Sequence, residues 1–320
     1  MLYPENTHSQ RIPVVVILGP TAVGKTEIAI QLAERLKGEI VSADSRLFYI
    51  GMDIGTAKPT PSEQRRVPHH LINVTPPDRT WSLALFQQRA RQVINDIYTH
   101  GHLPFLVGGT GQYVRAVIEE WDIPKVEPDP VLRNALENWA TQISPQGLYH
   151  RLVVLDPAAA AQIDPRNLRR TIRALEVILR TGKRFSSQRQ RRISPYHLLR
   201  LGLWRPRQEL YERIDRRIEA QVTAGLVKEV KNLLSKGYAP DLPAFSAIGY
   251  REMIAYLQGT VTLDEAIVQM KRTSRIFVRR QANWFKPTDP TIRWFQVGPQ
   301  TIEDMEKAIK EWTNEIYDSG

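Results

Sequence analysis

Short apolar runs alternate with longer segments of helical periodicity over the first third of the chain. The run VVVIL at 14–18 is typical of a buried strand, and TEIAIQLAERLKG at 26–38 repeats apolar side chains at helical spacing. EIVSAD at 39–44 and LPFLV at 103–107 predict further strands, and 82–101 predicts a helix. This alternation indicates an α/β fold built on a parallel sheet.

The pattern changes after Trp121, where the Pro-rich stretch IPKVEPDP interrupts it. Helical periodicity resumes at 131–143, and the chain is helical and basic from Asp164 to about Arg192. Strand character returns at 197–204. We therefore predict an α/β core that is interrupted by a helical insertion domain. The core comprises 1–121 and 197–320, and the insertion comprises 122–196.

The end of the chain repeats the α/β character. Two or three long helices are expected after 204, then a strand at 291–297 and a C-terminal helix from Thr301. One of these helices is expected to start at Thr262, because Thr262 and Glu265 have the spacing of a capping box.

The segment GPTAVGKT at 19–26 matches G-x-x-x-x-G-K-[ST] and stands between a predicted strand and a predicted helix. Its glycines let backbone N–H groups turn toward phosphate, the lysine adds a charge, and the hydroxyl of Thr26 can bind Mg²⁺. The motif predicts a phosphate site without specifying a nucleotide, since a diphosphate monoester would fit equally well. The predicted phosphate-binding residues are Gly19, Thr21, Ala22, Val23, Gly24, Lys25 and Thr26.

Asp44 ends the next predicted strand, where ligands bind in open α/β sheets. It could hold a metal or accept a proton, or it could simply cap a following helix, and position alone does not separate these. GGTG at 108–111 is either a tight turn or a place where a substrate approaches the backbone.

ATPases with this loop carry an apolar strand that ends in a metal-binding aspartate. The best candidate strand here ends in glycines, and LVVLD at 152–156 is a weak alternative inside the insertion. An ATPase is therefore disfavoured, whereas a small-molecule kinase stays open.

The 320 residues carry a net charge of +10 and no cysteine. Disulfides and thiolate zinc sites are thus excluded, and a polyanionic partner is favoured. Residues 1–13 do not resemble a signal peptide, and no apolar run could span a bilayer, so we expect a cytosolic protein without a membrane partner. Much of the excess charge lies between Arg166 and Arg217. The basic residues of this run are Arg166, Arg169, Arg170, Arg173, Arg180, Lys183, Arg184, Arg189, Arg191, Arg192, Arg200, Arg205, Arg207, Arg213, Arg216 and Arg217.

A second basic stretch, 271–286, places Arg272, Arg275, Arg279 and Lys286 on one predicted helical stripe. Phe277 is expected in the core, together with one of the two aromatic residues Trp284 and Phe285. Gln281 and Asn283 could read a base edge or hold a backbone. The pair His69–His70 is expected beside or within a strand, and no His-x-x-x-His zinc motif is present.

Together, the segments GPTAVGKT, SADSRLFYIGMDIGTAKP, LVGGTGQYV, RTIRALEV, AIGYRE and RRQANWFK resemble the bacterial tRNA dimethylallyltransferase family. The resemblance runs in order over about 12–297. It implies a P-loop NTPase-like core with a helical insertion domain that binds the tRNA anticodon stem. It also implies transfer of a dimethylallyl group from dimethylallyl diphosphate to the exocyclic amine of the adenosine 3′ of the anticodon, with Mg²⁺.

The resemblance implies catalytic roles for Asp44 as proton acceptor, for Thr26 as catalytic residue and metal ligand, and for Arg217 on the diphosphate. It implies tRNA contacts by Asp44, Ser45, Arg46, Leu47, Thr110, Arg166, Asn167, Leu168, Arg169, Arg170, Ser246, Ala247, Ile248, Gly249, Tyr250, Arg251, Arg279, Arg280, Gln281, Asn283, Trp284 and Lys286. The chain departs from the family pattern at Val278, Arg279, Asn283 and Lys286. A monomer is expected. A P-loop kinase and a non-catalytic RNA-binding protein are the competing hypotheses.

Overall fold

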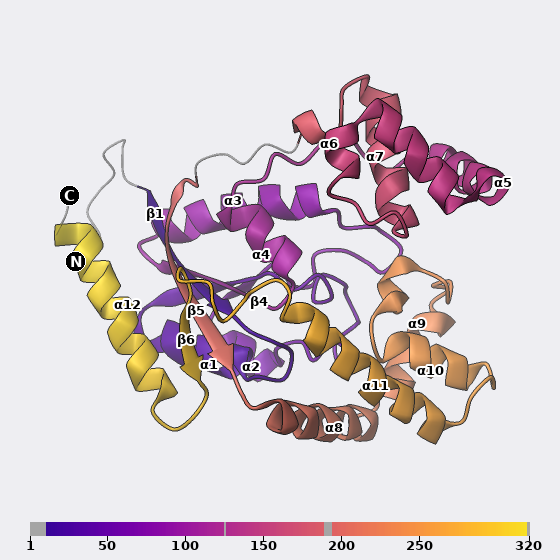
Figure 1. Ribbon diagram of the computed structural model, residues 1–320. Coiled ribbons are helices and arrows are strands. Elements are labelled where there is room, and N and C mark those ends of the chain that lie inside the picture. The colour runs from indigo at the N-terminus through magenta and orange to yellow at the C-terminus, as the bar shows by residue number, and fades with distance from the viewer. Residues whose placement is uncertain (1–10, 125, 189–193, 319–320) are drawn as a thin grey trace. The chain divides into compact units, whose positions relative to one another are not determined.

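The computed structural model describes residues 11–124, 126–188 and 194–318 (Figure 1). The chain forms two compact units. The first contains the described residues up to Ile118 and from Pro195 onward, and the second is Glu119–Ser194. Residues 1–10, Arg189, Arg191 and Arg192, about which the sequence makes predictions, lie outside the described residues.

A six-stranded sheet forms the centre of the first unit, with every neighbouring pair of strands parallel. Its spatial order is β3-β2-β4-β1-β5-β6. The parallel α/β architecture predicted from the sequence is therefore confirmed. The strands are β1 (Ile12–Leu18), β2 (Gly38–Ser42), β3 (His69–His70), β4 (Leu103–Gly108), β5 (Tyr196–Trp204) and β6 (Arg293–Gln296).

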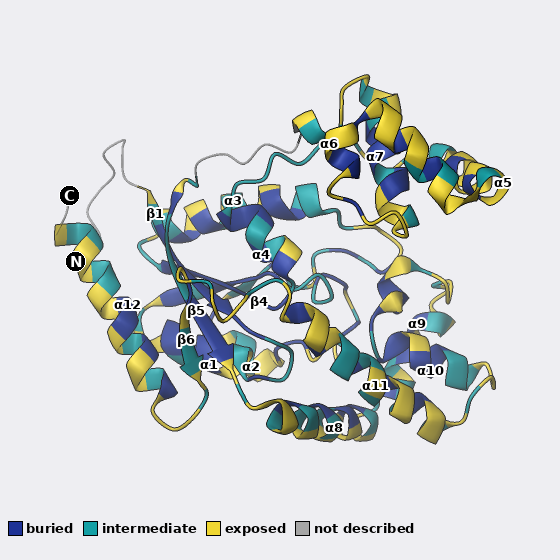
Figure 2. Ribbon diagram, in the orientation of Figure 1, coloured by how far each residue is buried: buried dark blue, intermediate teal, exposed yellow. Residues whose placement is uncertain are grey.

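The central strand β1 is buried on both faces, and its side chains alternate between two apolar layers. Val15 and Ile17 join one core cluster, which includes residues of α1 (Lys25–Arg35), and Val16 and Leu18 join the other, which includes residues of α3 (Leu83–Thr99). Figures 1 and 2 show α1 and α3 on opposite sides of the sheet, each with a buried face toward it. The helices of this half are α1 (Lys25–Arg35), α2 (Pro61–Arg66), α3 (Leu83–Thr99) and α4 (Gly111–Ile118).

Four helices, rather than the two or three predicted, separate β5 from β6. They are α8 (Arg207–Thr223), α9 (Leu226–Ser235), α10 (Tyr250–Leu257) and α11 (Leu263–Gln281), with a short 3₁₀ turn η2 (Pro243–Ser246) before α10. The capping box is confirmed at the start of α11, where Thr262 and Glu265 bond reciprocally. The chain ends in α12 (Thr301–Asp318).

The second unit is helical. It contains α5 (Pro130–Leu155), α6 (Pro157–Ala160), α7 (Leu168–Thr181) and η1 (Ser186–Gln188). α5 is broken at Ser144, where φ is 72° before Pro145. α7 ends at Thr181 because Gly182 takes a left-handed conformation, so this helix stops short of the predicted basic run to Arg192.

The weak candidate for a metal-binding strand, 152–156, is wrong. Residues up to Leu155 are helical, and Asp156 is a buried cap whose carboxylate accepts hydrogen bonds from Ala159 N, Ser186 N and Ser186 Oγ. Those bonds explain its burial without a metal. Among the residues that the structure describes, no helix is both long and apolar enough to cross a bilayer.

Candidate active site

The loop between β1 and α1 occupies the carboxyl end of the central strand. Gly24 is the N-cap of α1 with φ 111°, a conformation that residues with a side chain rarely adopt. The first turn of a helix leaves N–H groups without intrahelical partners, so this end of α1 favours an anion. The geometry is that of a phosphate cradle.

Lys25, the first residue of α1, turns its ammonium group back toward the loop. Nζ donates hydrogen bonds to the carbonyl oxygens of Gly19 at 2.9 Å and Pro20 at 2.8 Å. Burial lowers the pKa of Lys25 to about 8, an effect that Asp44 opposes and Arg217 reinforces. A bound diphosphate would stabilise the charged amine.

Arginines from β5 to α8 reach the same loop. Nε of Arg205 donates to Val23 O at 3.0 Å, and Nε of Arg213 donates to Ala22 O at 2.7 Å. Arg217 donates a hydrogen bond to Thr56 O at 3.4 Å. Burial lowers the pKa of Arg217, and the nearby Asp44 opposes this effect in part. Part of the arginine run therefore lines the candidate site within the first unit.

Asp44 follows β2 and faces the loop, but no helix begins there, so the helix-capping alternative is wrong. Instead Oδ1 accepts the backbone N–H of Arg46 at 3.0 Å within a turn. The guanidinium of Arg46 bonds to Pro243 O, Ala244 O and Ser246 Oγ, which ties this turn to η2. Oδ2 of Asp44 accepts no hydrogen bond from the described residues.

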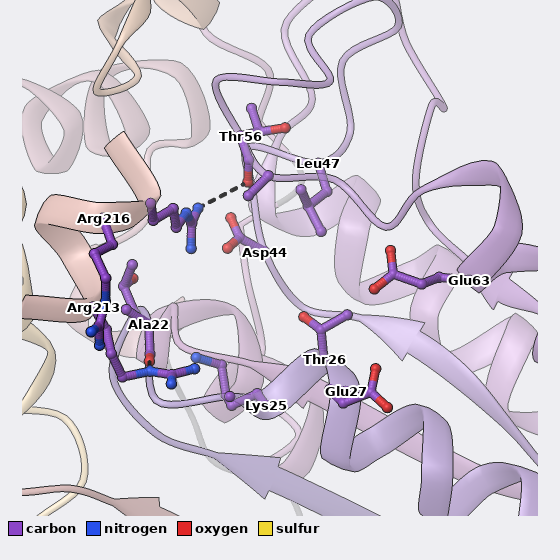
Figure 3. A pocket seen from close by; sticks show the side chains of 14 residues that line it. Ala22, Lys25, Thr26, Glu27, Asp44, Leu47, Thr56, Glu63, Arg213 and Arg216 are labelled. Atoms are coloured by element: carbon purple, nitrogen blue, oxygen red, sulfur yellow. Dashed lines mark hydrogen bonds between the residues drawn. The ribbon is translucent and has the colours of Figure 1, made fainter. Parts of the chain in front are cut away.

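These groups surround one pocket of about 490 Å³, into which Lys25, Asp44 and Arg213 project (Figure 3). Its lining places three arginines and one lysine opposite the carboxylates of Asp44, Glu27 and Glu63. The lining residues are Thr21, Ala22, Gly24, Lys25, Thr26, Glu27, Asp44, Leu47, Thr56, Ala57, Glu63, Arg213, Arg216 and Arg217.

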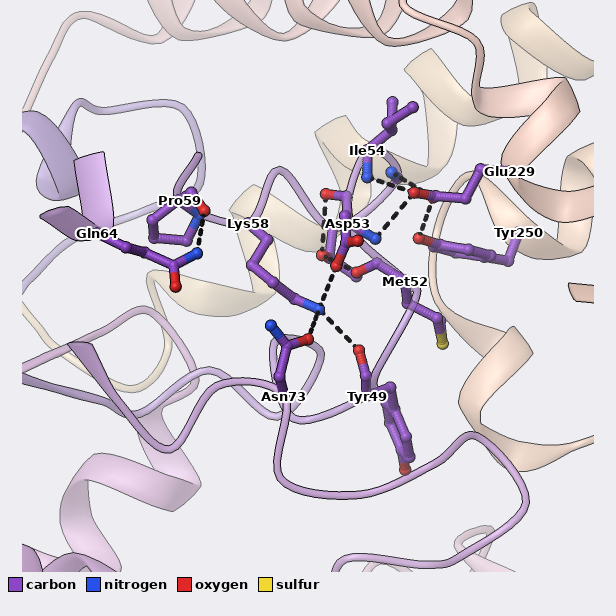
Figure 4. Close-up of polar contacts among 12 residues, drawn as sticks. Tyr49, Met52, Asp53, Ile54, Lys58, Pro59, Gln64, Asn73, Glu229 and Tyr250 are labelled. Carbon is purple, nitrogen blue, oxygen red and sulfur yellow. Dashed lines mark hydrogen bonds and ion pairs between the residues drawn. The ribbon is translucent and has the colours of Figure 1, made fainter. Parts of the chain in front are cut away.

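The pocket wall at Thr56 and Ala57 belongs to a loop held by contacts that no pattern in the sequence predicts (Figure 4). Glu229 of α9 accepts hydrogen bonds from Asp53 N, Ile54 N and Gly55 N, and from Tyr250 Oη at 2.6 Å. No spacing in the sequence singles out Glu229, because the three backbone N–H groups that it binds lie more than 170 residues earlier in the chain.

The same loop is also fixed from inside. The ammonium group of Lys58 is nearly fully buried and donates to Tyr49 O, Asp53 Oδ1 and Asn73 Oδ1. A buried charge with three acceptors is held firmly, since losing any of them leaves it undersolvated. Gln221 of α8 donates to Ile54 O and Gly55 O.

GGTG lies at the carboxyl end of β4, beside the phosphate loop. The expected open approach for a substrate is not found at Gly109, because protein atoms fill the space: an added Cβ would lie 2.5 Å from Gln281 Nε2 and 3.0 Å from Gly19 O. Thr110 is half-buried just after it. These glycines bring loops of the protein together.

The expected tRNA contacts at 246–251 divide by burial. Ser246 and Arg251 are exposed, whereas Ala247, Gly249 and Tyr250 are buried and Ile248 is half-buried. Tyr250 packs in the core, and its hydroxyl is taken by Glu229. In the turn after Asp44, Ser45 and Leu47 are half-buried.

The predicted stripe of 271–286 is shorter than expected, since α11 ends at Gln281 and Lys286 lies beyond it. Arg275 pairs with Asp215 at 2.6 Å, and Phe277, expected in the core, is 39% exposed. Gln281 is buried, and Trp284 is half-buried. The charged and polar residues of this stretch that stay exposed are Arg272, Arg279, Arg280, Asn283 and Lys286.

In the second unit, the expected tRNA-binding residues surround the start of α7. Arg166 pairs with Asp164 at 3.0 Å, and Asn167 caps the helix by accepting from Arg170 N. Arg169 and Arg170 are exposed, and Leu168 is half-buried. Two exposed arginines in one helical turn favour an anionic partner.

Other arginines of this unit are committed internally. Glu176, fully buried, accepts from Arg133 and Arg173. Burial alone would raise the pKa of Glu176, but hydrogen bonds from Arg133, the N–H of Asp129 and Arg173 outweigh it and lower that pKa to about 2. Arg173 therefore stabilises the fold.

The parallel sheet and the loop between β1 and α1 define a P-loop NTPase-like protein. Two family models match the chain: IPP transferase over 47–288 and Isopentenyl transferase over 12–73. The chain belongs to this family of tRNA isopentenyl transferases, so the resemblance inferred from the sequence is confirmed.

Two relatives named tRNA dimethylallyltransferase illustrate the similarity. That of Roseiflexus sp. (strain RS-1) is 54% identical over 302 residues, covering 94% of this chain and 99% of the relative. That of Thermomicrobium roseum is 46% identical over 313 residues, covering 98% of this chain and 95% of the relative.

Solved structures agree with this assignment. The tRNA isopentenylpyrophosphate transferase of Bacillus halodurans matches with a TM-score of 0.72 and 43% identity, over 96% of this chain and 98% of that one. A eukaryotic dimethylallyltransferase, whose structures are described as snapshots of the enzyme acting on tRNA, matches with a TM-score of 0.79 and 27% identity, over 95% and 78%.

Proposed function

We propose that this protein transfers a dimethylallyl group from dimethylallyl diphosphate to the exocyclic amine of the adenosine 3′ of the anticodon in tRNA. The observation that carries this proposal is the pocket, where Lys25, Arg213 and Arg217 face a single strand-end carboxylate, Asp44. The cations suit a departing diphosphate, and the carboxylate suits the proton that the amine must lose.

The reaction breaks the allylic C–O bond, and the electron pair leaves with the diphosphate. Negative charge therefore grows on oxygens next to the loop, where N–H groups at the start of α1, Lys25 and the α8 arginines stabilise it more than they stabilise the intact donor. Of the predicted diphosphate-binding residues, Thr21, Ala22, Gly24, Lys25 and Thr26 line the pocket and are assigned to the diphosphate, together with Arg217. Gly19 and Val23 are buried parts of the same loop.

The new C–N bond forms from the amine lone pair, which adenine delocalises into its ring. The amine proton passes to Asp44, whose Oδ1 accepts the N–H of Arg46 while Oδ2 is left available. The Arg46 turn thereby sets the direction of the second oxygen. An adenine inside an anticodon loop must be extruded to reach this point.

The residues of the pocket fit Mg²⁺. The Thr26 hydroxyl makes no hydrogen bond with the described residues, and the carboxylates in the lining offer only oxygen donors. Mg²⁺ is usually held by one or two protein oxygens with substrate phosphates and water, which agrees with the absence of any cluster of three or more His, Asp or Glu ligands among the described residues. Bound through Thr26, the ion would neutralise charge on the diphosphate.

tRNA contacts are assigned to exposed groups on both units, each considered by itself. Arg169 and Arg170 on α7 suit the backbone of the anticodon stem, and Arg279 and Arg280 on α11 suit phosphates near the loop. Ser246, the last residue of η2, and Arg251, in the first turn of α10, are also exposed. The buried members of the expected set, such as Tyr250, would support this surface.

Incubation with dimethylallyl diphosphate labelled in its prenyl group and with unmodified tRNA tests the proposal. We expect label in tRNA, and in N6-substituted adenosine after digestion to nucleosides. ATP-dependent transfer of phosphate to a small molecule, with no label in RNA, would instead support the kinase hypothesis. tRNA binding without either reaction would support a non-catalytic RNA-binding protein.

A further inference from the structure

We infer that Gln281, the last residue of α11, is a positioning residue that holds the phosphate loop to the loop after β4. Its Oε1 accepts the backbone N–H of Thr21 at 2.8 Å, and its Nε2 donates to Gly109 O at 3.0 Å. The residue is 7% exposed. This inference deepens the proposed function, because it names what keeps the diphosphate site in shape.

The contact joins segments that are otherwise remote. Thr21 and Gln281 are 260 positions apart, and Gly109 belongs to neither segment. A buried amide with both ends paired strongly resists replacement, since an apolar side chain would leave an N–H and a carbonyl buried without partners. The end of α11 therefore fixes the backbone of two loops at once.

The space around the contact is also filled. A Cβ on Gly109 would lie 2.5 Å from Gln281 Nε2, 3.0 Å from Gly19 O and 3.3 Å from Lys25 Nζ. The amide thus packs within a few ångströms of the carbonyl and ammonium groups that shape the cradle. A shift of the amide would therefore disturb the packing beside Gly19 O and Lys25 Nζ.

This assignment differs from the base or backbone contact that the sequence suggests for Gln281. Both polar atoms of its amide are already bonded inside the protein and the residue is 7% exposed, so little of the amide is left for RNA to reach. The Thr21 N–H is likewise occupied. The phosphate-binding N–H groups of the loop must therefore come from later residues, toward the start of α1.

Replacement by a side chain of similar length without hydrogen-bonding groups tests the role. In Gln281→Met we expect the Kd for inorganic pyrophosphate, measured by calorimetry on the full chain, to rise about tenfold or more. The KM for dimethylallyl diphosphate should rise in parallel, while the Kd for unmodified tRNA changes less than about twofold. Gln269→Met, at an exposed position of the same helix, is the matched control.

A second variant, Gln281→Glu, gives a readout that loss of packing would not produce. A protonated carboxyl group can accept from Thr21 N and donate to Gly109 O, whereas the carboxylate cannot donate. The ratio of its pyrophosphate Kd to that of the wild type should therefore shrink as the pH falls from 8 to 5.5. Taking the ratio cancels the ionisation of pyrophosphate itself.

Weakened tRNA binding by Gln281→Met with unchanged pyrophosphate affinity would overturn the inference and return Gln281 to an RNA contact. So would a pH-independent Gln281→Glu ratio. The pyrophosphate measurements need neither tRNA nor a prenyl donor, so they decide the role of Gln281 even if the wild type transfers no label to tRNA. Failure of the proposed function would appear only in that transfer assay.

Discussion

Arg213 of α8 donates a hydrogen bond from Nε to the carbonyl oxygen of Ala22, at 2.7 Å, and lines the pocket beside it. One side chain therefore shapes the phosphate loop and presents a charge to whatever the loop holds. Its pKa is lowered by burial and by the nearby Arg205 and Arg216, partly opposed by Glu209. The charged form of such a buried group is stabilised most when an anion binds next to it.

Arg213→Lys keeps the charge but loses the fixed direction of Nε. A lysine ammonium cannot bond to Ala22 O and face the ligand as a planar guanidinium does, so we expect the KM for dimethylallyl diphosphate to rise about tenfold. The KM for tRNA should stay within about twofold. Steady-state kinetics with each substrate varied measures both values, and Arg207→Lys, at the exposed start of α8, is the control. An unchanged donor KM would show that the Ala22 contact is dispensable.

Asp44→Asn removes the proposed proton acceptor with little change of shape. We expect kcat to fall by about 10²–10⁴-fold, the usual contribution of a positioned base, while tRNA affinity is retained. Single-turnover transfer of labelled prenyl group into tRNA, with a parallel binding assay, separates the two effects. Asp78→Asn, which removes a carboxylate from an exposed loop, should react at the wild-type rate. A variant that transfers normally would rule out the proton-acceptor role of Asp44.

Much of the fold follows from the sequence because it depends on local periodicity. The strand at β1, the helix after it and the glycine of the phosphate loop are neighbours in the chain, so their pattern predicts their structure. Asp44 could be placed near that loop because parallel strands end at the same edge of a sheet. These predictions need no knowledge of distant contacts.

The contacts that fix the pocket could not be predicted in the same way. Glu229 and Gln281 act on segments 170 or more residues away, and each resembles an ordinary polar residue of a helix in the sequence. Phe277 is predicted to be buried but is 39% exposed. Helical spacing shows which residues share a face of a helix, but whether that face is buried depends on the neighbouring helices. The resemblance implies a tRNA contact for Tyr250, but periodicity does not reveal that this residue is buried with its hydroxyl bound to Glu229.

Diphosphate binding should depend on pH through Lys25, because burial lowers the pKa of its amine to about 8. Below this pH the amine is charged and attracts diphosphate; above it the free protein must take up a proton to bind. The ratio of the pyrophosphate Kd of Lys25→Met to that of the wild type should therefore be largest near pH 7 and fall as the pH rises through 8 to 9.5. Calorimetry at several pH values measures it. A ratio constant over this range would contradict a lowered pKa.

The stability of the folded protein should depend on pH in the opposite direction: the contribution of Lys25 to stability should increase as the pH rises. A lysine whose pKa is lower when folded binds fewer protons than in the unfolded chain between pH 8 and about 10.5, so wild-type stability gains with pH in that window. Lys25→Met lacks this gain. The difference in Tm between wild type and variant should thus shift in favour of the wild type from pH 7.5 to 10, and no shift would argue against burial of the charged amine.

Arg169 and Arg170 are exposed on α7, whereas Arg173 on the same helix is committed to Glu176. If the first two neutralise tRNA phosphates, each releases a counterion on binding. The slope of log K against log salt should then become shallower by about 0.7–0.9 for each of Arg169→Gln and Arg170→Gln. Arg35→Gln removes an equal charge from a surface ion pair with Glu306 and should leave the slope unchanged. Filter binding of unmodified tRNA at several salt concentrations gives these slopes, and equal slopes for all variants would mean that the exposed arginines of α7 are merely solvated.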